Sequence, residues 1–184
     1  AYMDFSKNFN NSNSGFDIAP KAHPRCKAVF LDRDGVINHD PGDYTTCIEE
    51  FTLLPTAMKA LKSLKERGYI FILITNQGGI AKGIYGHREV GLIHDFLKQE
   101  CERNGTTLTD VYYSPHHEIT GKSLSRKPGS MMIERAMARY NIDAENSWMV
   151  GDKQRDLDCA AVLGVKGVLI PTNAPLIDFI DQIN

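Results

Sequence analysis

The stretch Lys27-Ala-Val-Phe-Leu-Asp-Arg-Asp-Gly-Val36 decides the fold of this chain. Its apolar run, Ala28 to Leu31, is typical of a buried strand in a parallel sheet. The run ends in Asp32 and Asp34, which share a face because side chains two residues apart on a strand point the same way. Buried charges need a cation or solvent, and in parallel sheets a cleft lies beyond the carboxyl ends of the strands. The stretch therefore predicts two acids aimed into a cleft, although an ordinary acidic turn before Gly35 has the same pattern.

Length and composition predict a single globular domain. The chain has 184 residues, 42% apolar and 24% charged, with a net charge of -2. This charge gives no pull toward nucleic acid or membranes, and no apolar run reaches the ~20 residues of a membrane helix. The four cysteines are scattered, which favours the cytoplasm. We expect a flexible N-terminal arm at residues 1–25, one domain at 26–184, and a monomer.

Apolar segments of two kinds alternate along the chain. Short apolar runs predict strands at residues 28–31, 69–74, 110–113, 147–150 and 165–170. Helical periodicity predicts helices at residues 56–67, 87–104, from Pro128 onward, through Leu157, Ala160 and Ala161, and at 176–180. The polar stretch 36–51 is predicted to form a flap. This alternation is typical of an α/β fold with a parallel sheet and right-handed crossovers.

Polar residues follow four of the predicted strands. They are Asp32 with Asp34, Thr75-Asn76, the loop residues Arg126-Lys127, and Gly151-Asp152 with Asp156. Each alone has an ordinary structural explanation, such as Asp152 as a helix N-cap or Thr75 bonding to the backbone. Because the carboxyl ends of parallel strands meet at one edge of the sheet, we expect the four sets to form one site.

Phosphoryl transfer is the chemistry that needs this combination. Mg²⁺ prefers oxygen ligands and is held by few carboxylates, which fits Asp32 and Asp152. A carboxylate nucleophile, Asp32, forms an aspartyl-phosphate and splits one hard step into two. Asp34 protonates the leaving oxygen and then takes a proton from water. Lys127 and donors around Thr75 hold the equatorial oxygens of the phosphoryl group.

The same motifs resemble the haloacid dehalogenase (HAD) superfamily. More closely, the chain resembles the D-glycero-D-manno-heptose 1,7-bisphosphate phosphatases and the related histidinol-phosphate phosphatases. The resemblance spans residues 27 to about 170 and is carried by Asp32-Arg-Asp-Gly-Val-Ile-Asn38, Thr75-Asn-Gln-Gly-Gly-Ile-Ala-Lys-Gly83, Tyr112-Tyr-Ser-Pro-His116, Arg126-Lys-Pro128 and Met149-Val-Gly-Asp-Lys153. It implies a three-layer Rossmann-like fold with a flap but no separate cap domain. Only the flap and the loop 114–126 remain to cover the site.

The resemblance also implies roles for individual residues. Asp32 is expected to be the nucleophile, Asp34 the acid and base, and Thr75 with Lys127 the phosphate grip. Mg²⁺ is expected on Asp32, the backbone carbonyl of Asp34, and Asp152. The expected substrate-binding residues are Asp40, Tyr44, Asn76, Gln77, Arg126 and Lys153. The implied reaction is removal of the C7 phosphate of a small sugar bisphosphate, in the synthesis of nucleotide-activated heptose for lipopolysaccharide.

One departure from the family pattern concerns zinc. Family members often carry a zinc loop of the form Cys-Pro-His followed by Cys-x-Cys before Arg-Lys-Pro. Here serines occupy the cysteine positions, at Ser114, Ser123 and Ser125. Zinc needs thiolate or imidazole ligands in a closed four-coordinate shell, and His116 with His117 supplies at most two. We therefore predict that the chain has no structural zinc.

Three other functions share part of the pattern. Histidinol-phosphate phosphatase is the nearest, because the same motifs resemble it. Removal of 3′-phosphates from polynucleotides shares the Asp-x-Asp-Gly start, but the chain has no basic stripe for nucleic acid. A module that binds a phosphorylated metabolite without turnover is the third. Such a module would gain from losing the acids that repel phosphate, and both Asp32 and Asp34 are present.

Overall fold

A five-stranded, wholly parallel sheet forms the centre of the molecule. The computed structural model describes residues 24–184, so nearly all of the predicted arm, residues 1–25, lies outside the described residues. The strands lie in the order β3-β2-β1-β4-β5. Their bounds are β1 (Ala28–Leu31), β2 (Ile70–Asn76), β3 (Leu108–Ser114), β4 (Trp148–Gly151) and β5 (Lys166–Leu169). The predicted α/β class with a parallel sheet is confirmed.

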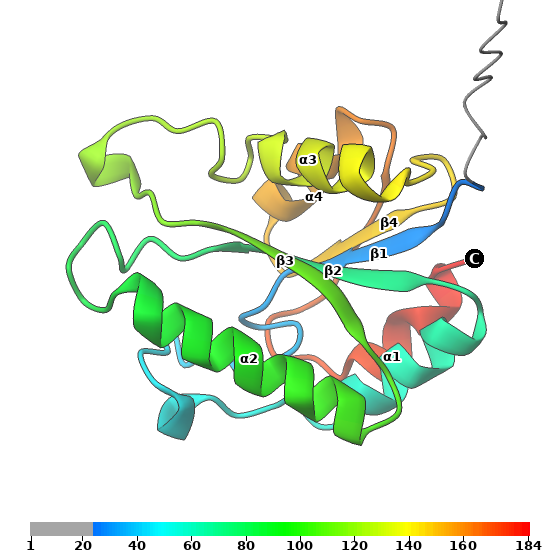
Figure 1. Ribbon diagram of the computed structural model, residues 1–184, viewed down its shortest axis with the longest axis horizontal. Coiled ribbons are helices and arrows are strands. Elements are labelled where there is room, and N and C mark those ends of the chain that lie inside the picture. Colours follow the sequence, from blue (N-terminus) through cyan, green and yellow to red (C-terminus); the bar gives the residue numbers. More distant parts are fainter. Residues whose placement is uncertain (1–23) are drawn as a thin grey trace, which may run out of the picture.

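Helices cover both faces of this sheet and give a three-layer structure (Figure 1). On one face lie α1 (Ala57–Glu66), α2 (His87–Arg103) and the 3-10 helix η3 (Leu176–Gln182), and on the other α3 (Met131–Tyr140) and α4 (Gln154–Ala161). Two shorter 3-10 helices, η1 (Ile48–Glu50) and η2 (Glu118–Thr120), lie in loops. No helix within residues 24–184 is long and apolar enough to cross a membrane.

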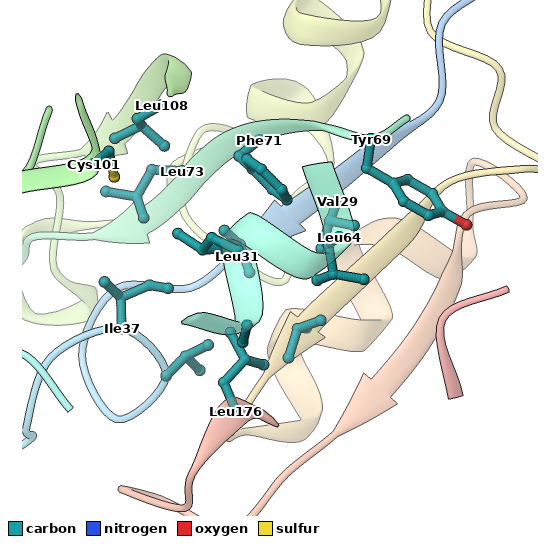
Figure 2. Packing of buried hydrophobic residues seen from close by; sticks show 14 of the residues in the cluster. Val29, Leu31, Ile37, Leu64, Tyr69, Phe71, Leu73, Cys101, Leu108 and Leu176 are labelled. Atoms are coloured by element: carbon teal, nitrogen blue, oxygen red, sulfur yellow. The ribbon is translucent and has the colours of Figure 1, made fainter. Parts of the chain in front are cut away.

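The alternation of side chains along the strands feeds two hydrophobic cores. Val29 and Leu31 of β1 pack in the core beneath α1, α2 and η3, part of which Figure 2 shows. Ala28 and Phe30, on the opposite face, pack in the core beneath α3 and α4. The central strand β1 is apolar and buried throughout because both of its faces are covered. Full burial of a large apolar side chain contributes roughly 1.5–3 kcal/mol.

The order of the strands determines where a cleft forms. From β1 the chain moves outward to β2 and β3, and then returns to the other side of β1 to add β4 and β5. Connections on the two sides of β1 therefore diverge between β1 and β4, which is the topological switch point where doubly wound sheets bind ligands. Asp32 follows β1 directly and Asp152 follows β4 directly, so both acids lie at this point.

Several predicted boundaries differ from the structure. Helix α3 begins at Met131, three residues after Pro128, because residues 126–129 form a turn in which the N–H of Gly129 donates to Arg126 O at 2.7 Å. Ala161 is exposed, whereas α4 buries Asp156 and Cys159. The predicted final helix is a 3-10 helix.

The predicted flap is shorter than residues 36–51. Val36 and Ile37 lie in the hydrophobic core, and Asn38 is buried beside them. Residues 39 and 41–43 are exposed before the chain returns through η1. The side-chain amide of Asn173 donates to Asp40 O at 2.9 Å and accepts from its N–H at 2.7 Å, which fixes the base of the exposed part.

Candidate active site

A buried lysine joins two aspartates at the carboxyl edge of the sheet. Lys127 Nζ lies 2.8 Å from Asp32 Oδ1 and 2.8 Å from Asp156 Oδ1. It also donates to the carbonyl oxygen of Ile74, near the end of β2, at 2.7 Å. Lys127 is 2% exposed and Asp156 is fully buried. Three segments that are distant in the sequence therefore meet at one ammonium group.

Asn76 holds the backbone of Lys127 in place. Its side-chain oxygen accepts from the N–H of Lys127 at 3.0 Å, and its side-chain nitrogen donates to Lys127 O at 3.2 Å. This reciprocal pair connects the last residue of β2 to a loop 51 residues further along the chain. Asn76, which was predicted to contact substrate, thus uses both ends of its amide to position the lysine.

The charges in this cluster are set by burial and by one another. Burial raises the pKa of Asp32 to about 6, with Lys127 opposing the rise and Asp156 adding to it. Burial would lower the pKa of Lys127, but Asp32 and Asp156 outweigh it and raise that pKa instead. At neutral pH the site therefore holds an ionised Asp32 beside a charged lysine.

A third acid completes the cluster. Carboxylate oxygens of Asp32, Asp152 and Asp156 lie within 4.8 Å of one another, and this spacing and chemistry fit a hard divalent cation. Two glycines allow the carboxylates of Asp152 and Asp156 to lie this close to the backbone. A Cβ at Gly35, where φ is +83°, would lie 2.7 Å from Asp152 Oδ2, and one at Gly151 would lie 2.3 Å from the Cβ of Asp156.

Lys153 and Thr172 contact Asp152 from the outer side. Lys153 Nζ lies 2.8 Å from Asp152 Oδ2, and the hydroxyl of Thr172 donates to the same oxygen at 2.6 Å. The lysine also donates to Thr172 Oγ1 at 2.8 Å. The hydrogen bond to Asp152 raises the pKa of Lys153 above its usual value. Lys153, predicted to bind substrate, therefore lies at the edge of the candidate metal site.

Asp34 is bound from two sides. Its Oδ1 accepts from Arg33 and Asn38, and its Oδ2 accepts from Gln77 Nε2 at 3.2 Å. Gln77 Nε2 also donates to Thr75 Oγ1 at 2.9 Å. Although burial opposes it, the Arg33 guanidinium and these hydrogen bonds lower the pKa of Asp34. Asp34 and Thr75 are thus joined through one amide group.

An aromatic pair connects this amide to the flap. The hydroxyl of Tyr85 donates to Gln77 Oε1 at 2.8 Å, which fixes the amide orientation with its nitrogen toward Asp34. The ring of Tyr85 packs edge-on against Tyr44, at 5.8 Å between centroids, and Lys82 Nζ lies 5.3 Å from the Tyr44 ring. Tyr44 therefore contacts residues that follow β2. The carboxylate of Asp40, in contrast, accepts from the N–H of Gly42 within the flap.

Arg126 lies in the loop that follows β3. Its Nη1 donates to the carbonyl of His116 at 3.0 Å, and its Nε lies 3.8 Å from the exposed Glu118. The three serines of the same loop form a chain of hydroxyls: Ser125 Oγ lies 3.1 Å from Ser114 Oγ and 3.0 Å from Ser123 Oγ. These contacts bring the two ends of the loop together beside Arg126.

A pocket of about 630 Å³ opens behind this loop. Its walls come from residues 118–129, including Glu118, Leu124, Arg126 and Lys127. None of the four aspartates of the candidate site lines it. The pocket therefore shares Lys127 with the sheet edge but none of the acids that meet there.

Some residues at the site were not among the predicted site residues. The sequence motif contains Asp156 but does not predict its role, and the motifs predict no role for Arg33, Tyr85 or Thr172. The sequence could have indicated a site role for Asp156, since an acid four residues after Asp152 lies in the first turn of the following helix. The sequence does not indicate site roles for Thr172 and Tyr85, because their contacts depend on how distant loops fold back.

The fold and the site together define the class of protein. The HAD-hydrolase-like family model matches residues 124–175, which include Lys127, Asp152 and Asp156. The crystal structure of a D,D-heptose 1,7-bisphosphate phosphatase from B. bronchiseptica, complexed with magnesium and phosphate, superposes with a TM-score of 0.74 at 30% identity. The match covers 85% of this chain and 86% of that one. The chain has the fold of a HAD-like phosphatase, as predicted.

Sequence relatives narrow the family. The chain is 35% identical over 160 residues to D-glycero-alpha-D-manno-heptose-1,7-bisphosphate 7-phosphatase of Photorhabdus laumondii, covering 83% of this chain and 87% of the relative. It is 40% identical over 146 residues to the corresponding beta-anomer enzyme of Haemophilus ducreyi, covering 76% and 80%. The chain therefore belongs to the heptose-1,7-bisphosphate phosphatase family of HAD hydrolases.

Proposed function

We propose that this chain is a Mg²⁺-dependent phosphatase that removes the C7 phosphate of D-glycero-D-manno-heptose 1,7-bisphosphate. The observation that carries the proposal is the 2.8 Å ion pair between Asp32 and Lys127, at the sheet edge where Asp152 also lies. A nucleophile, a cation for phosphate and metal ligands are thus available together. The names of relatives that are 35% and 40% identical support the choice of sugar bisphosphate.

In the reaction that we propose, a carboxylate oxygen of Asp32 attacks phosphorus while the bond to the leaving oxygen breaks. The negative charge of a bound phosphate opposes the lowering of the Asp34 pKa by Arg33. Asp34 can then take up a proton, donate it to that oxygen, and accept one from the water that hydrolyses the aspartyl-phosphate. The charge of Lys127, whose three N–H groups donate to Asp32, Asp156 and Ile74 O, and the hydroxyl of Thr75 stabilise the equatorial oxygens, over which the negative charge spreads. Lys127 Nζ and the N–H of Arg33 both contact Oδ1 of Asp32, which supports Oδ2 as the attacking atom.

The donor set fits magnesium. Carboxylates of Asp32 and Asp152, with the backbone carbonyl of Asp34, are the ligands that we propose. Asp156 accepts from Lys127 and from the N–H of Lys153, so we assign it to positioning the lysine. When bound, the cation neutralises part of the charge repulsion between phosphate and the carboxylates. The magnesium and phosphate complex of the B. bronchiseptica neighbour supports this assignment.

The rest of the substrate is proposed to lie between the flap and the loop of Arg126. The guanidinium fork of Arg126 suits a second phosphate or a pair of sugar hydroxyls, and Lys153 adds a second cation at the rim. Asp40 and Tyr44 supply the flap side. Asn76 and Gln77 contribute through Lys127, Asp34 and Thr75, to which their amides are bonded.

Three further properties belong to this proposal. The loop needs no structural zinc, since hydroxyls are poor zinc ligands and those of Ser114, Ser123 and Ser125 bond to one another. The enzyme acts in the cytoplasm, which its four free cysteines support, within the synthesis of nucleotide-activated heptose for lipopolysaccharide. A monomeric state is part of the same proposal. Its substrate is a small molecule and neither nucleic acid nor membrane, in keeping with a net charge of -2.

A steady-state panel tests the proposal. Both anomers of the heptose bisphosphate, histidinol phosphate and a 3′-phosphorylated oligonucleotide are compared in the presence of Mg²⁺, with Asp32→Asn as the matched control. We expect kcat/KM for one heptose anomer to exceed that for histidinol phosphate by about 100-fold or more, because the latter lacks the second phosphate. Asp32→Asn should lose turnover by at least about 10⁴-fold while folding normally.

Other outcomes select the alternatives. Preferred turnover of histidinol phosphate would make the chain a histidinol-phosphate phosphatase. Tight binding of a phosphorylated metabolite without turnover would make it a binding module. Full activity of Asp32→Asn would end the covalent mechanism. The relatives include enzymes named for either anomer, so the two heptose substrates also decide this specificity.

A further inference from the structure

Arg33 lies between Asp32 and Asp34 in the chain, and its side chain faces away from the cleft. Because side chains alternate along an extended chain, Asp32 and Asp34 face the cleft while Arg33 faces the interior. It is 1% exposed. Its guanidinium nevertheless returns to the next residue: Nε and Nη2 both donate to Asp34 Oδ1, at 3.2 Å and 3.0 Å. A buried cation is thus paired with its own chain neighbour.

The donors divide unequally between the two oxygens of Asp34. Oδ1 accepts from two nitrogens of Arg33 and, at 2.9 Å, from Asn38 Nδ2. Oδ2 accepts from Gln77 Nε2 at 3.2 Å. A carboxylate oxygen has about two lone-pair directions, so three donors fill Oδ1. Oδ2 is therefore the oxygen with room for a reacting group, and the Asp34 side chain is 28% exposed.

The surroundings of Arg33 direct its guanidinium to Asp34. Its Nη1 lies 3.5 Å from Nε2 of the buried His94, an imidazole that packs edge-on against Tyr113. Asp34 is the carboxylate with which Arg33 forms an ion pair in the described part of the chain. A neutral acceptor on one side and the aspartate on the other hold the fork in one orientation.

We propose that Arg33 is a positioning residue that locks Oδ1 of Asp34 and turns Oδ2 toward the leaving group. The inference rests on the proposed function, in which Asp34 gives its proton to the leaving oxygen. In that step the electron pair of the breaking phosphorus–oxygen bond stays on the leaving oxygen, which takes the proton, while Asp32 bonds to phosphorus. A misdirected Asp34 slows this step only when the leaving oxygen needs the proton.

The experiment compares leaving groups in the Mg²⁺-loaded enzyme. The sugar bisphosphate leaves as a basic alkoxide that needs protonation, whereas 4-nitrophenyl phosphate leaves as a stable phenolate. For Arg33→Met we expect kcat/KM to fall about 100-fold with the sugar bisphosphate, because general acid catalysis contributes at least this much, and no more than about fivefold with the aryl phosphate. Arg33→Lys keeps a buried cation without the fork and should show the same selectivity at about tenfold.

Two reference variants interpret the result. Asp34→Asn should show the same selectivity as Arg33→Met, with a larger loss. Arg67→Met removes a guanidinium that donates to Ile180 O at 2.7 Å and to Ile183 O at 3.1 Å, away from the site. It should lower the melting temperature without changing the ratio of the two kcat/KM values.

Each outcome bears on the inference. Equal losses on both substrates, or no loss, in Arg33→Met overturn it. If Arg33→Met does not fold, Arg33→Lys decides in the same way. Selectivity in Asp34→Asn but not in either Arg33 variant would overturn the positioning role alone. Wild-type activity of Asp34→Asn would instead overturn the proposed function.

Discussion

Arg126 and Lys127 are neighbours in the chain but belong to different regions of the molecule. Lys127 enters the buried edge of the sheet, where it contacts Asp32, Asp156 and the carbonyl of Ile74. Arg126 stays in the loop after β3, and its contacts with His116 and Glu118 lie within ten residues. One region is held by contacts between distant segments, the other by contacts within one loop.

This difference separates chemistry from specificity. Charges buried in the sheet edge interact strongly and have little freedom to move, which suits groups that must meet a transition state. Charges in a loop interact weakly in the ground state and adapt to the ligand, which suits recognition. We therefore expect replacement of Lys127 to impair folding and turnover, and replacement of Arg126 to impair substrate recognition.

The largest effect is expected from Lys127→Met. It leaves Asp32 and Asp156 buried without their cation, and breaking such a network by removing one partner costs about 3–5 kcal/mol of folding free energy. Activity should fall by about 10³-fold in addition, because a donor to the transferring phosphoryl group is lost. Urea unfolding and steady-state kinetics measure the two losses. Lys65→Met, which removes an exposed lysine bonded to Gly105 O, is the control, and a similar small change in both variants would contradict the buried network.

Arg126→Ala should act mainly on substrate recognition. We expect kcat/KM for the sugar bisphosphate to fall about 10–100-fold, the value of a hydrogen bond to a charged group, and that for 4-nitrophenyl phosphate to change less than about threefold. The unfolding free energy should fall by about 1 kcal/mol, because the hydrogen bond to His116 O is lost. Glu118→Gln, which removes the exposed acid 3.8 Å away, should not weaken binding. Equal losses on both substrates would move Arg126 into the catalytic group.

The buried region should also respond to acid through His94. Burial and the nearby Arg33 lower the pKa of His94 to about 3, with Asp34 opposing and Lys98 adding to the fall. The unfolded chain takes up this proton near pH 6.5 and the folded chain does not. Stability from this group is therefore complete above pH 6.5 and is lost as the pH falls toward 3, at about 1.4 kcal/mol per pH unit.

His94→Gln keeps a polar acceptor near Arg33 but cannot take up the proton. The unfolding free energy of the wild type minus that of the variant, measured from pH 7.5 to 4.5, should therefore decrease as the pH falls. Carboxylates titrate in both proteins and cancel in this difference. A difference that is constant with pH would mean that His94 is protonated in the folded state.

The sequence predicted the buried region better than the loops. Ala28 to Leu31 could be assigned because both faces of a central parallel strand are apolar, and Asp32 and Asp152 followed because such strands end at one edge. The substrate contacts predicted for Asn76 and Gln77 stay a prediction, and the sequence did not indicate that their amides bond to Lys127, Asp34 and Thr75. Periodicity reports which residues are buried, whereas these partners depend on how segments about 50 residues apart approach one another.

The smallest effect is expected in the loop, from Ser125→Ala. Its hydroxyl pairs with those of Ser114 and Ser123, and a hydroxyl pair of this kind contributes about 1 kcal/mol. The unfolding free energy should fall by about that amount. Because Arg126 follows directly, KM for the sugar bisphosphate should rise about two- to threefold with kcat unchanged, a shift worth well under 1 kcal/mol. A fall in kcat instead would show that the hydroxyl chain also fixes Lys127, and the boundary between the two regions would then lie before Ser125 rather than between Arg126 and Lys127.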